Sequence, residues 1–524
     1  MQMPLRRTAL TLVLCVSAMP AYAQDHPAVQ RLRALLSAQV TLNYHAASPV
    51  EGSPDAVRLS GVTLTRGNET ISMASLLLDR LTENSAARVE AEGVQGTMDG
   101  TPVRVARFQM AGLTYTPTPA SAPAVPPPAP VAPVPPPVTR PQGQLVPPGS
   151  PPMAPKPGMP GAQAPLAGQP GLPGKPGAQA PRPNVQIPPS PNRPGGMAHA
   201  DRPMPDAFTL DSALVEGFEV QGTPRVSIAR MTVRDYGIGR RSTTLLEGLT
   251  VAGIPASPVS DFVMARFTGE GLDLAAWLNA AARDASPPGL PAGRASLNVE
   301  GVELSATGAP VGGLERLSVE IATEADQSGT GSIGLRGLRV RQHPLTAPFL
   351  TMLDLPGIDA SLTMDTTYRA ADGHVDIPAL AIGVQQLGAT ALALRLDGWT
   401  PEAARNHDPS RMRLLGFRLR QADDGMYDRI LRQQAQRAGI TADQMRQRHL
   451  QMSQAALSAP PGTPEPPGLA SLREAVLRFV RGEARTIEVI ANPPQPVPMQ
   501  QMQAAGPQGA PALAQLLGLS GSNP

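Results

Sequence analysis

The chain has 524 residues, of which 44 are Lys or Arg and 42 are Asp or Glu, so its formal net charge at pH 7 is +2. Acidic and basic residues are interspersed and only 3% of the residues are aromatic, so we expect no nucleic-acid partner. The length would allow three or more domains, but the 62 prolines and 50 glycines are unevenly placed and mark a long interruption.

Residues 1–23 are typical of a cleaved secretory signal peptide. Arg6 and Arg7 precede a short apolar run, and the sequence Ala21-Tyr22-Ala23 after it predicts cleavage between Ala23 and Gln24. The run is about half of the roughly twenty residues that a membrane-spanning helix needs, so we expect no transmembrane segment in the mature chain. We therefore predict a periplasmic protein.

Cys15, the single cysteine, allows a second interpretation as a lipid-attachment site. Leu14 precedes it where a small residue is expected, and cleavage at Cys15 would leave the downstream Ala-x-Ala site unused. On the favoured interpretation the mature chain has no thiol, and its stability comes from buried apolar area.

Residues 24–115 are predicted to form a short helix followed by a β block. Asp25 is a suitable N-cap, and Pro27 suits the first helical turn. Val29, Leu32, Leu35 and Leu36 then make one apolar stripe. From Val40 to Tyr115 apolar and polar residues alternate, which indicates strands, and Gly67-Asn68 predicts a hairpin turn.

Residues 116–205 are predicted to be a disordered spacer rich in proline and glycine. About every third residue is proline and aromatic residues are absent, so the segment cannot bury enough apolar surface to offset its ordering entropy. We interpret it as an insertion within, or between two halves of, one extended antiparallel β assembly.

Residues 206–422 return to strand patterns, interrupted by one helix predicted from about Leu272 to Arg283. Triplets with a central glycine recur along both β blocks, and we interpret them as bulges or bends in a repeated hairpin unit. They are Ser60-Gly61-Val62, Glu92-Gly93-Val94, Glu216-Gly217-Phe218, Glu247-Gly248-Leu249, Glu300-Gly301-Val302 and Arg336-Gly337-Leu338.

Residues 423–524 are predicted to be mainly helical. Gly439 is a suitable helix stop, Thr441 and Gln444 make a capping box, and an amphipathic helix surrounds Leu472 and Phe479. The predicted fold class is therefore α+β: mainly antiparallel β in repeated hairpins that form an extended or curved sheet, with a helical C-terminal region and a long disordered insertion.

No catalytic or cofactor motif is recognisable, so we assign no catalytic or cofactor-binding residue and no cofactor. Asp372-Gly373-His374-Val375-Asp376 is the one compact group of acids and histidine, and Asp-Gly followed by alternating residues favours a hairpin turn.

Met445, His449 and Met452 are a weak candidate metal site. They share one helix face, with Met499 and Met502 downstream, and thioethers with imidazole suit Cu(I). The alternative is a methionine-rich packing face, since the chain has 20 methionines. We therefore assign no metal, and these three residues are the one candidate site to test.

Arginine clusters suggest two further surfaces, which we interpret as helix faces that either contact anionic lipid or pair with nearby acids. One cluster is Arg411, Arg413, Arg418 and Arg420, and the other is Arg473, Arg478 and Arg481.

The repeated amphipathic strands with Gly-Val and Gly-Leu junctions, following an export signal, resemble the AsmA-like and YdgA-like envelope proteins of Gram-negative bacteria. The resemblance covers at most Val40 to Tyr115 and Phe208 to Leu396, and it transfers no functional residue. It implies a curved sheet with an apolar groove and a role in lipid transport or envelope maintenance. The long proline insertion and the helical C-terminal region depart from those proteins.

We therefore predict a non-enzymatic periplasmic scaffold or binding protein whose partner is a lipid or another envelope protein. Two alternatives stay open. The chain could be a periplasmic enzyme whose residues are scattered in sequence, or it could act as a structural spacer through the proline-rich segment.

Overall fold

A computed structural model describes residues 26–36, 39–98, 100–115, 208–283, 285, 289–406, 408–460 and 462–524. These residues all belong to one compact unit of the chain. The predicted signal peptide, its cleavage site at Ala23 and Gln24, and the predicted spacer 116–205 lie outside the described residues.

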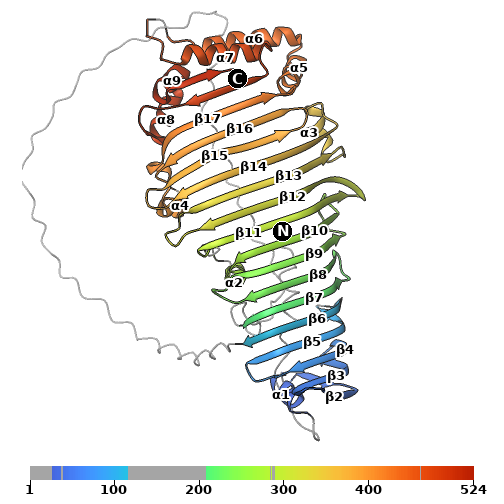
Figure 1. Ribbon diagram of the computed structural model, residues 1–524. Helices are drawn as coiled ribbons and strands as arrows, with labels where there is room; N and C mark the ends of the chain where they lie inside the picture. Colours follow the sequence, from blue (N-terminus) through green and yellow to red (C-terminus); the bar gives the residue numbers. More distant parts are fainter. Residues whose placement is uncertain are drawn as a thin grey trace, which may run out of the picture. The chain divides into compact units, whose positions relative to one another are not determined.

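Twenty strands of the described residues form one antiparallel sheet (Figure 1). Those before the insertion are β1 (Val40–Asn43), β2 (Ala46–Val50), β3 (Ser53–Arg66), β4 (Glu69–Asp79), β5 (Ser85–Met98) and β6 (Thr101–Tyr115). Those of the second block are β7 (Phe208–Val220), β8 (Arg225–Tyr236), β9 (Ser242–Ala252), β10 (Asp261–Leu272), β11 (Gly293–Ala306), β12 (Ala309–Thr323), β13 (Gly329–Arg341), β14 (Gly357–Arg369), β15 (His374–Val384), β16 (Gly388–Asp397) and β17 (Arg413–Asp423). The last are β18 (Thr486–Ala491), β19 (Val497–Pro498) and β20 (Leu519–Ser522).

The helices lie at the ends of the sheet and in a few connections between strands. They are α1 (Pro27–Leu35), α2 (Leu274–Ala282), α3 (Ala347–Met352), α4 (Pro401–Asn406), α5 (Met426–Ala438), α6 (Ala442–Ala456), α7 (Leu469–Arg481), α8 (Met499–Ala505) and α9 (Ala510–Leu517), with the short 3₁₀ helices η4 (Pro409–Arg411) and η5 (Gly506–Gln508). The predicted fold class, α+β with mainly antiparallel strands and helices concentrated towards the C-terminus, is confirmed.

The sheet is a meander in which each strand from β3 to β17 pairs with the next along the chain. At one end β1 and β2 both pair with β3, and at the other β17 pairs with β18 and β19 while β18 pairs with β20. The helical C-terminal region therefore contributes strands to the same sheet.

The insertion does not interrupt the sheet. Strand β6 ends at Tyr115 and β7 begins at Phe208, and these two residues are cross-strand partners. The two β blocks predicted from the sequence therefore form one sheet, with residues 116–207 joining two paired neighbours.

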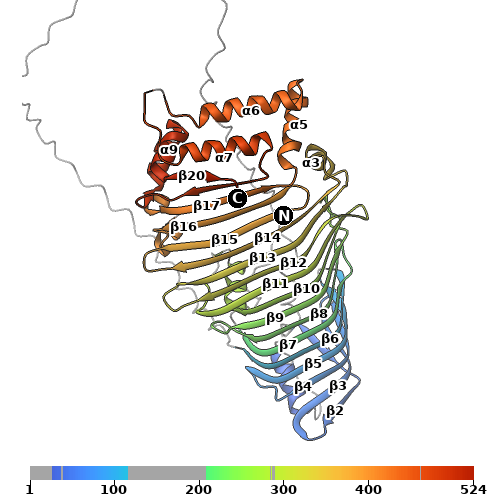
Figure 2. The ribbon, with the colours of Figure 1, turned by 45° about the horizontal axis from the view of Figure 1, so that its top comes forward.

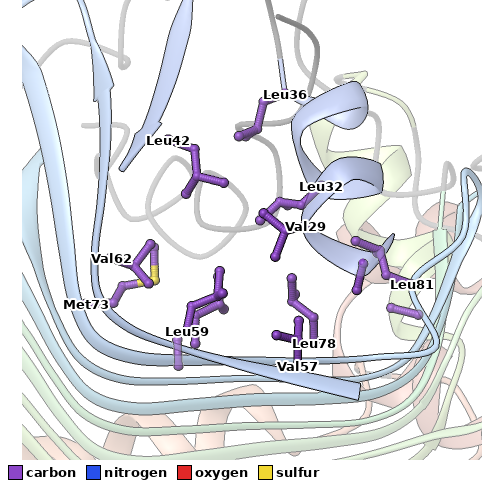
Figure 3. Packing of buried hydrophobic residues seen from close by; sticks show 14 of the residues in the cluster. Val29, Leu32, Leu36, Leu42, Val57, Leu59, Val62, Met73, Leu78 and Leu81 are labelled. Carbon is purple, nitrogen blue, oxygen red and sulfur yellow. The ribbon is translucent and has the colours of Figure 1, made fainter. Parts of the chain in front are cut away.

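Helix α1 packs on the concave side of β3–β6 (Figure 3). Its residues Val29 and Leu32 and its C-cap Leu36 join Leu59, Leu78 and other strand residues in the largest buried cluster. The N-cap is His26, whose ring Nδ1 accepts a hydrogen bond from the Ala28 amide, rather than the predicted Asp25. The predicted cap was wrong because the helix starts at Pro27, so that the residue directly before it, His26, takes the N-cap position; Asp25 lies outside the described residues.

Candidate functional site

The central glycines of the six predicted triplets lie in a single line across the sheet. Each has a positive φ, between +58° and +65°, which favours glycine. An alanine of the preceding strand stands beside four of them: an added Cβ would lie 3.1 Å from Ala74 at Gly93, and 2.8 Å from Ala106 at Gly217. The corresponding distances to a neighbouring alanine are 2.8 Å at Gly248 and 2.7 Å at Gly301. We call this line the glycine row.

The glycine row changes which side chains face the core. Leu59 and Val62 are three residues apart and would face opposite sides of a regular strand. Both nevertheless belong to the buried cluster beneath α1, because Gly61 between them bends the strand (Figure 3). The residues two before and one after each glycine therefore lie on the same face, which we call the inner face.

The inner face extends from this cluster across β7 to β13. The register of the strands identifies its residues, because paired residues of neighbouring strands point to the same side. Four rows of partners result. The two before the glycine row are Ala213, Val233, Thr244, Gly269, Leu297, Val319 and Ile333, and Val215, Met231, Leu246, Phe267, Val299, Leu317 and Leu335. The two after it are Phe218, Ile228, Leu249, Met264, Val302, Leu314 and Leu338, and Val220, Val226, Val251, Phe262, Leu304, Gly312 and Val340.

None of the positions in these four rows carries a charge, and Thr244 is the one polar side chain. The first row continues beyond β13 through Met364, Leu380 and Leu392, and the second continues through Leu362 and Ile382 as far as β15. Ile382 remains 40% exposed and Leu338 39% exposed. The inner face is thus a continuous apolar surface, still partly accessible over the middle strands of the described chain.

The opposite, outer face carries a charged row directly beside the glycine row. Its members alternate in sign across successive strands: Glu92, Arg107, Glu216, Arg230, Glu247, Arg266, Glu300 and Arg316. Arg230 and Glu216 are 3.8 Å apart, Arg266 and Glu247 3.9 Å, and Arg316 and Glu300 3.3 Å. The two faces of one sheet therefore differ sharply in polarity.

The sequence contains a further signal for this face, in the residue that precedes each triplet. Each triplet is preceded by an apolar residue, so the full unit is apolar-polar-Gly-apolar, as in Leu246-Glu247-Gly248-Leu249 and Val299-Glu300-Gly301-Val302. If the strand bends at the glycine, the apolar residue two positions before it and the one directly after it lie on the same face.

The acid–histidine group at Asp372 forms the predicted hairpin turn between β14 and β15. The His374 Nδ1 lies 2.7 Å from an Asp397 oxygen rather than from either acid of the predicted group. Asp372 instead accepts hydrogen bonds from Arg369, from Nε at 2.9 Å and Nη2 at 2.7 Å, which lower its pKa to about 2. Asp376 pairs with Thr367 and Arg395 in the ladder.

The predicted metal candidates lie in α6 and have different surroundings. Met445 is buried against Leu431 and Ala435, whereas Met452 is 67% exposed. His449 uses both ring nitrogens: Nδ1 is 3.0 Å from the Tyr427 hydroxyl and Nε2 is 2.8 Å from the Gln434 amide oxygen. Copper binding at this weak candidate site would require His449 to leave one of these partners.

Among the residues that the structure describes, no group of three or more His, Cys, Asp or Glu side chains is placed to hold a metal ion. None of the helices in that part of the chain is long and apolar enough to cross a bilayer.

Two members of each arginine cluster form ion pairs with acids. Arg413, Arg418 and Arg420 lie on strand β17, so the predicted helix face was wrong there, and Arg418 and Arg420 are spaced by the strand period of two. Arg418 contacts Glu488 at 3.7 Å and Arg411 contacts Glu402 at 3.7 Å. In the second cluster Arg473 contacts Glu465 at 2.6 Å, and Arg481 contacts Glu483 at 3.7 Å.

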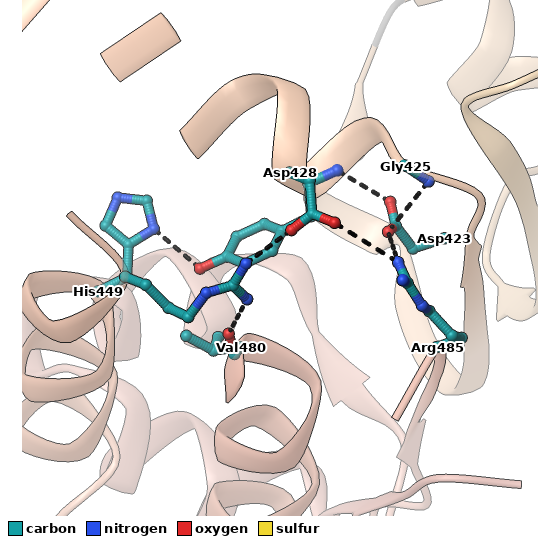
Figure 4. Close-up of polar contacts among 8 residues, drawn as sticks. Asp423, Gly425, Asp428, His449, Val480 and Arg485 are labelled. Atoms are coloured by element: carbon teal, nitrogen blue, oxygen red, sulfur yellow. Dashed lines mark hydrogen bonds and ion pairs between the residues drawn. The ribbon is translucent and has the colours of Figure 1, made fainter. Parts of the chain in front are cut away.

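A polar network joins α5, α6 and α7 to strand β17 (Figure 4). Asp423 at the end of β17 accepts the backbone amide of Tyr427 at 2.9 Å and that of Gly425 at 3.3 Å. Arg446 of α6 donates to Asp428 of α5 at 2.7 Å and to the Val480 carbonyl of α7 at 2.8 Å.

Tyr427 lies at the centre of this network. Its ring contacts Phe479 and stands beneath the Arg446 guanidinium, and its burial raises the pKa of its hydroxyl. The predicted capping box of Thr441 and Gln444 and the helix stop at Gly439 are both present. These contacts hold three helices in fixed positions at the C-terminal end of the sheet.

One protein family, described as "Uncharacterized protein", matches residues 381–524. This is about a quarter of the chain, and it covers the part from β15 to the C-terminal helices. No curated protein matches the chain.

Proposed function

We propose that this protein binds lipid acyl chains along the inner face of its sheet. The observation that carries the proposal is the set of four adjacent rows across β7–β13, which contain no charged side chain although a charged row runs along the outer face of the same strands. Burying a methylene group against such a surface contributes about 0.8 kcal/mol, so an acyl chain of about twelve carbons would gain roughly 10 kcal/mol before the costs of association.

An acyl chain fits this surface better than a polypeptide does. Strands β8 to β13 are each paired on both sides, so they present no free edge to which a peptide strand could add. The rows provide almost no hydrogen-bonding side chain, so the amide groups of a bound peptide would be left unsatisfied. An acyl chain has no such groups.

The proposed site of action is the periplasm. The support is the predicted signal peptide at residues 1–23, together with the resemblance of the strand repeats to AsmA-like and YdgA-like envelope proteins. Fusion of residues 1–30 to alkaline phosphatase should give activity in the periplasm of a Gram-negative host, and N-terminal sequencing of the exported chain should begin at Gln24.

Two neighbouring leucines of β9 provide the test of lipid binding. Leu246 lies on the inner face, and Leu245, which is also half-buried, points to the outer face. A charge in hydrocarbon costs about 2.5–3.5 kcal/mol, so Leu246→Asp should weaken binding of a fluorescent fatty acid by tenfold or more. Leu245→Asp should leave that affinity within about twofold of the parent chain.

The same chains should be purified from the bacterial envelope and their bound lipids analysed by mass spectrometry. The parent and Leu245→Asp should retain lipid, and Leu246→Asp should lose most of it. Absence of lipid from the parent chain together with absence of fatty-acid binding would refute the proposal, as would equal losses in the two variants.

A further inference from the structure

The inner face is covered at its N-terminal end. In the row that follows the glycines, Val62 is 0% exposed, Val94 4% and Val105 3%, whereas Leu338 of the same row is 39% exposed. Helix α1 causes this difference, because Val29 and Leu32 pack against the same cluster (Figure 3). An acyl chain lying on β8–β13 therefore meets a packed protein core when it reaches the strands under α1.

The inner face is also covered at its C-terminal end. Leu419, Val489 and Gly521 are successive partners in one inner row. At Gly521 an added Cβ would lie 2.7 Å from the Leu472 Cα, so helix α7 lies directly on this face (Figure 2). Beside it, Leu414 and Ala491 are buried in a cluster with Leu517 of α9.

We propose that acyl chains occupy only the stretch between these two covers, and that they enter and leave through its open side rather than along its length. This inference rests on the proposed lipid binding. It makes the protein a carrier of separate lipid molecules and not a conduit through which chains pass from end to end.

The size of the stretch fits a small number of molecules. Strands lie about 4.8 Å apart, so the distance from β8 to β17 along a row is about 40 Å. The hydrocarbon core of a bilayer is about 30 Å thick, so the acyl chains of one leaflet extend about 15 Å. Two to three acyl lengths would therefore fill the row, and binding should saturate at a low stoichiometry.

Phenylalanines on the inner face allow a direct test. Phe267 lies in the open stretch, whereas Phe108 is buried in the cluster with α1. Each would be replaced in the mature full-length chain by the photoreactive amino acid p-benzoylphenylalanine, a conservative aromatic substitution. The same amino acid at Leu414 would sample the cluster with α9, and at Thr268 it would sample the outer face beside Phe267.

The chains would be irradiated with vesicles of alkyne-tagged phosphatidylethanolamine or, separately, with alkyne-tagged palmitate, and adducts would be identified by mass. We expect lipid adducts at Phe267 at least tenfold above those at Phe108, Leu414 and Thr268. The lipid source that gives the adduct tells a phospholipid from a free fatty acid. Thermal melting of each chain checks that the substitutions at Phe108 and Leu414 leave the covers in place.

Comparable lipid adducts at Phe267, Phe108 and Leu414 in chains that melt like the parent would overturn the inference, since acyl chains would then run beneath both covers. Adducts at none of the four positions, with either probe, would instead mean that the proposed lipid binding itself is wrong. Binding that continues to rise beyond about one lipid per strand would also contradict a stretch that is covered at both ends.

Discussion

Gly217 and Ala106 stand so close that a Cβ added to the glycine would lie 2.8 Å from the alanine Cβ, and Gly217 also has a φ of +62°. Gly217→Ala should therefore combine a backbone cost of about 1–2 kcal/mol with an overpacking cost of about 1–3 kcal/mol. Gly67→Ala is the matched control, because Gly67 has a φ of +56° and nothing within 4 Å of an added Cβ. Urea denaturation should show a clearly larger loss for Gly217→Ala; equal losses would mean that the strands separate freely at the bend.

The pairing of Tyr115 with Phe208 predicts that residues 116–207 can be replaced by a two-residue Asn-Gly turn. The shortened chain should keep its far-UV circular dichroism per folded residue and should melt at the same or a higher temperature, because closing a shorter loop costs less entropy. A chain that no longer folds would show that the hairpin between β6 and β7 depends on the insertion.

Asp423 is predicted to be the most sensitive residue of the C-terminal polar network. Its side chain is 4% exposed and accepts the amides of Gly425 and Tyr427 at the start of α5. Asp423→Ala should lower the free energy of unfolding by about 1–3 kcal/mol, because it leaves two partly buried amides without an acceptor. Arg485→Ala removes the exposed partner of the same carboxylate and should cost less than about 1 kcal/mol. Chemical denaturation that ranks the two variants in reverse would contradict this assignment.

Asp372 should titrate well below an ordinary aspartate. The Arg369 side chain donates two hydrogen bonds to its carboxylate and lowers its pKa from 3.8 to about 2. Because the folded-state pKa is the lower one, the pair favours the folded chain above about pH 4, and this contribution is lost as the pH falls towards 2. Carboxyl ¹³C NMR should find the shift, and Arg369→Gln should move the pKa back towards 3.8; an unchanged value would assign the shift to another group.

Cu(I) titration under reducing conditions tests the methionine–histidine group of α6. His449 has a partner on each ring nitrogen and Met445 is packed against Leu431 and Ala435, so we expect no stoichiometric binding above micromolar affinity. His449→Ala should instead lower stability by about 1 kcal/mol through loss of two hydrogen bonds. One equivalent of tightly bound copper, abolished by the same substitution, would establish the metal site.

Much of the fold could be predicted from the sequence because its signals are local. The alternation of apolar residues predicted the strands, and the central glycines predicted bends at the positions where Gly61, Gly93 and Gly217 adopt positive φ. The capping box at Thr441 and the stop at Gly439 depend on residues a few positions apart. Such features need no knowledge of distant contacts.

What the sequence could not provide was the partner of each segment. The short strands β19 and β20 have too few residues to show a pattern, and they become strands because β17 and β18 offer them an edge. The pairing of Tyr115 with Phe208 spans the whole insertion. The candidate site depends on such pairings, since a row such as Leu246, Phe267 and Val299 exists only once the register of three strands is known.

The glycine row repeats with a period of two strands, because a glycine strand such as β9 alternates with an alanine strand such as β8. Insertion of one strand would place two glycines or two alanines side by side and reverse the direction of every later strand. Insertion of a whole hairpin keeps the row, the chain direction and the sign alternation of the charged row. Related chains should therefore differ in sheet length by even numbers of strands, in steps of about 10 Å, and each step would add capacity for hydrocarbon without redesign of either covered end.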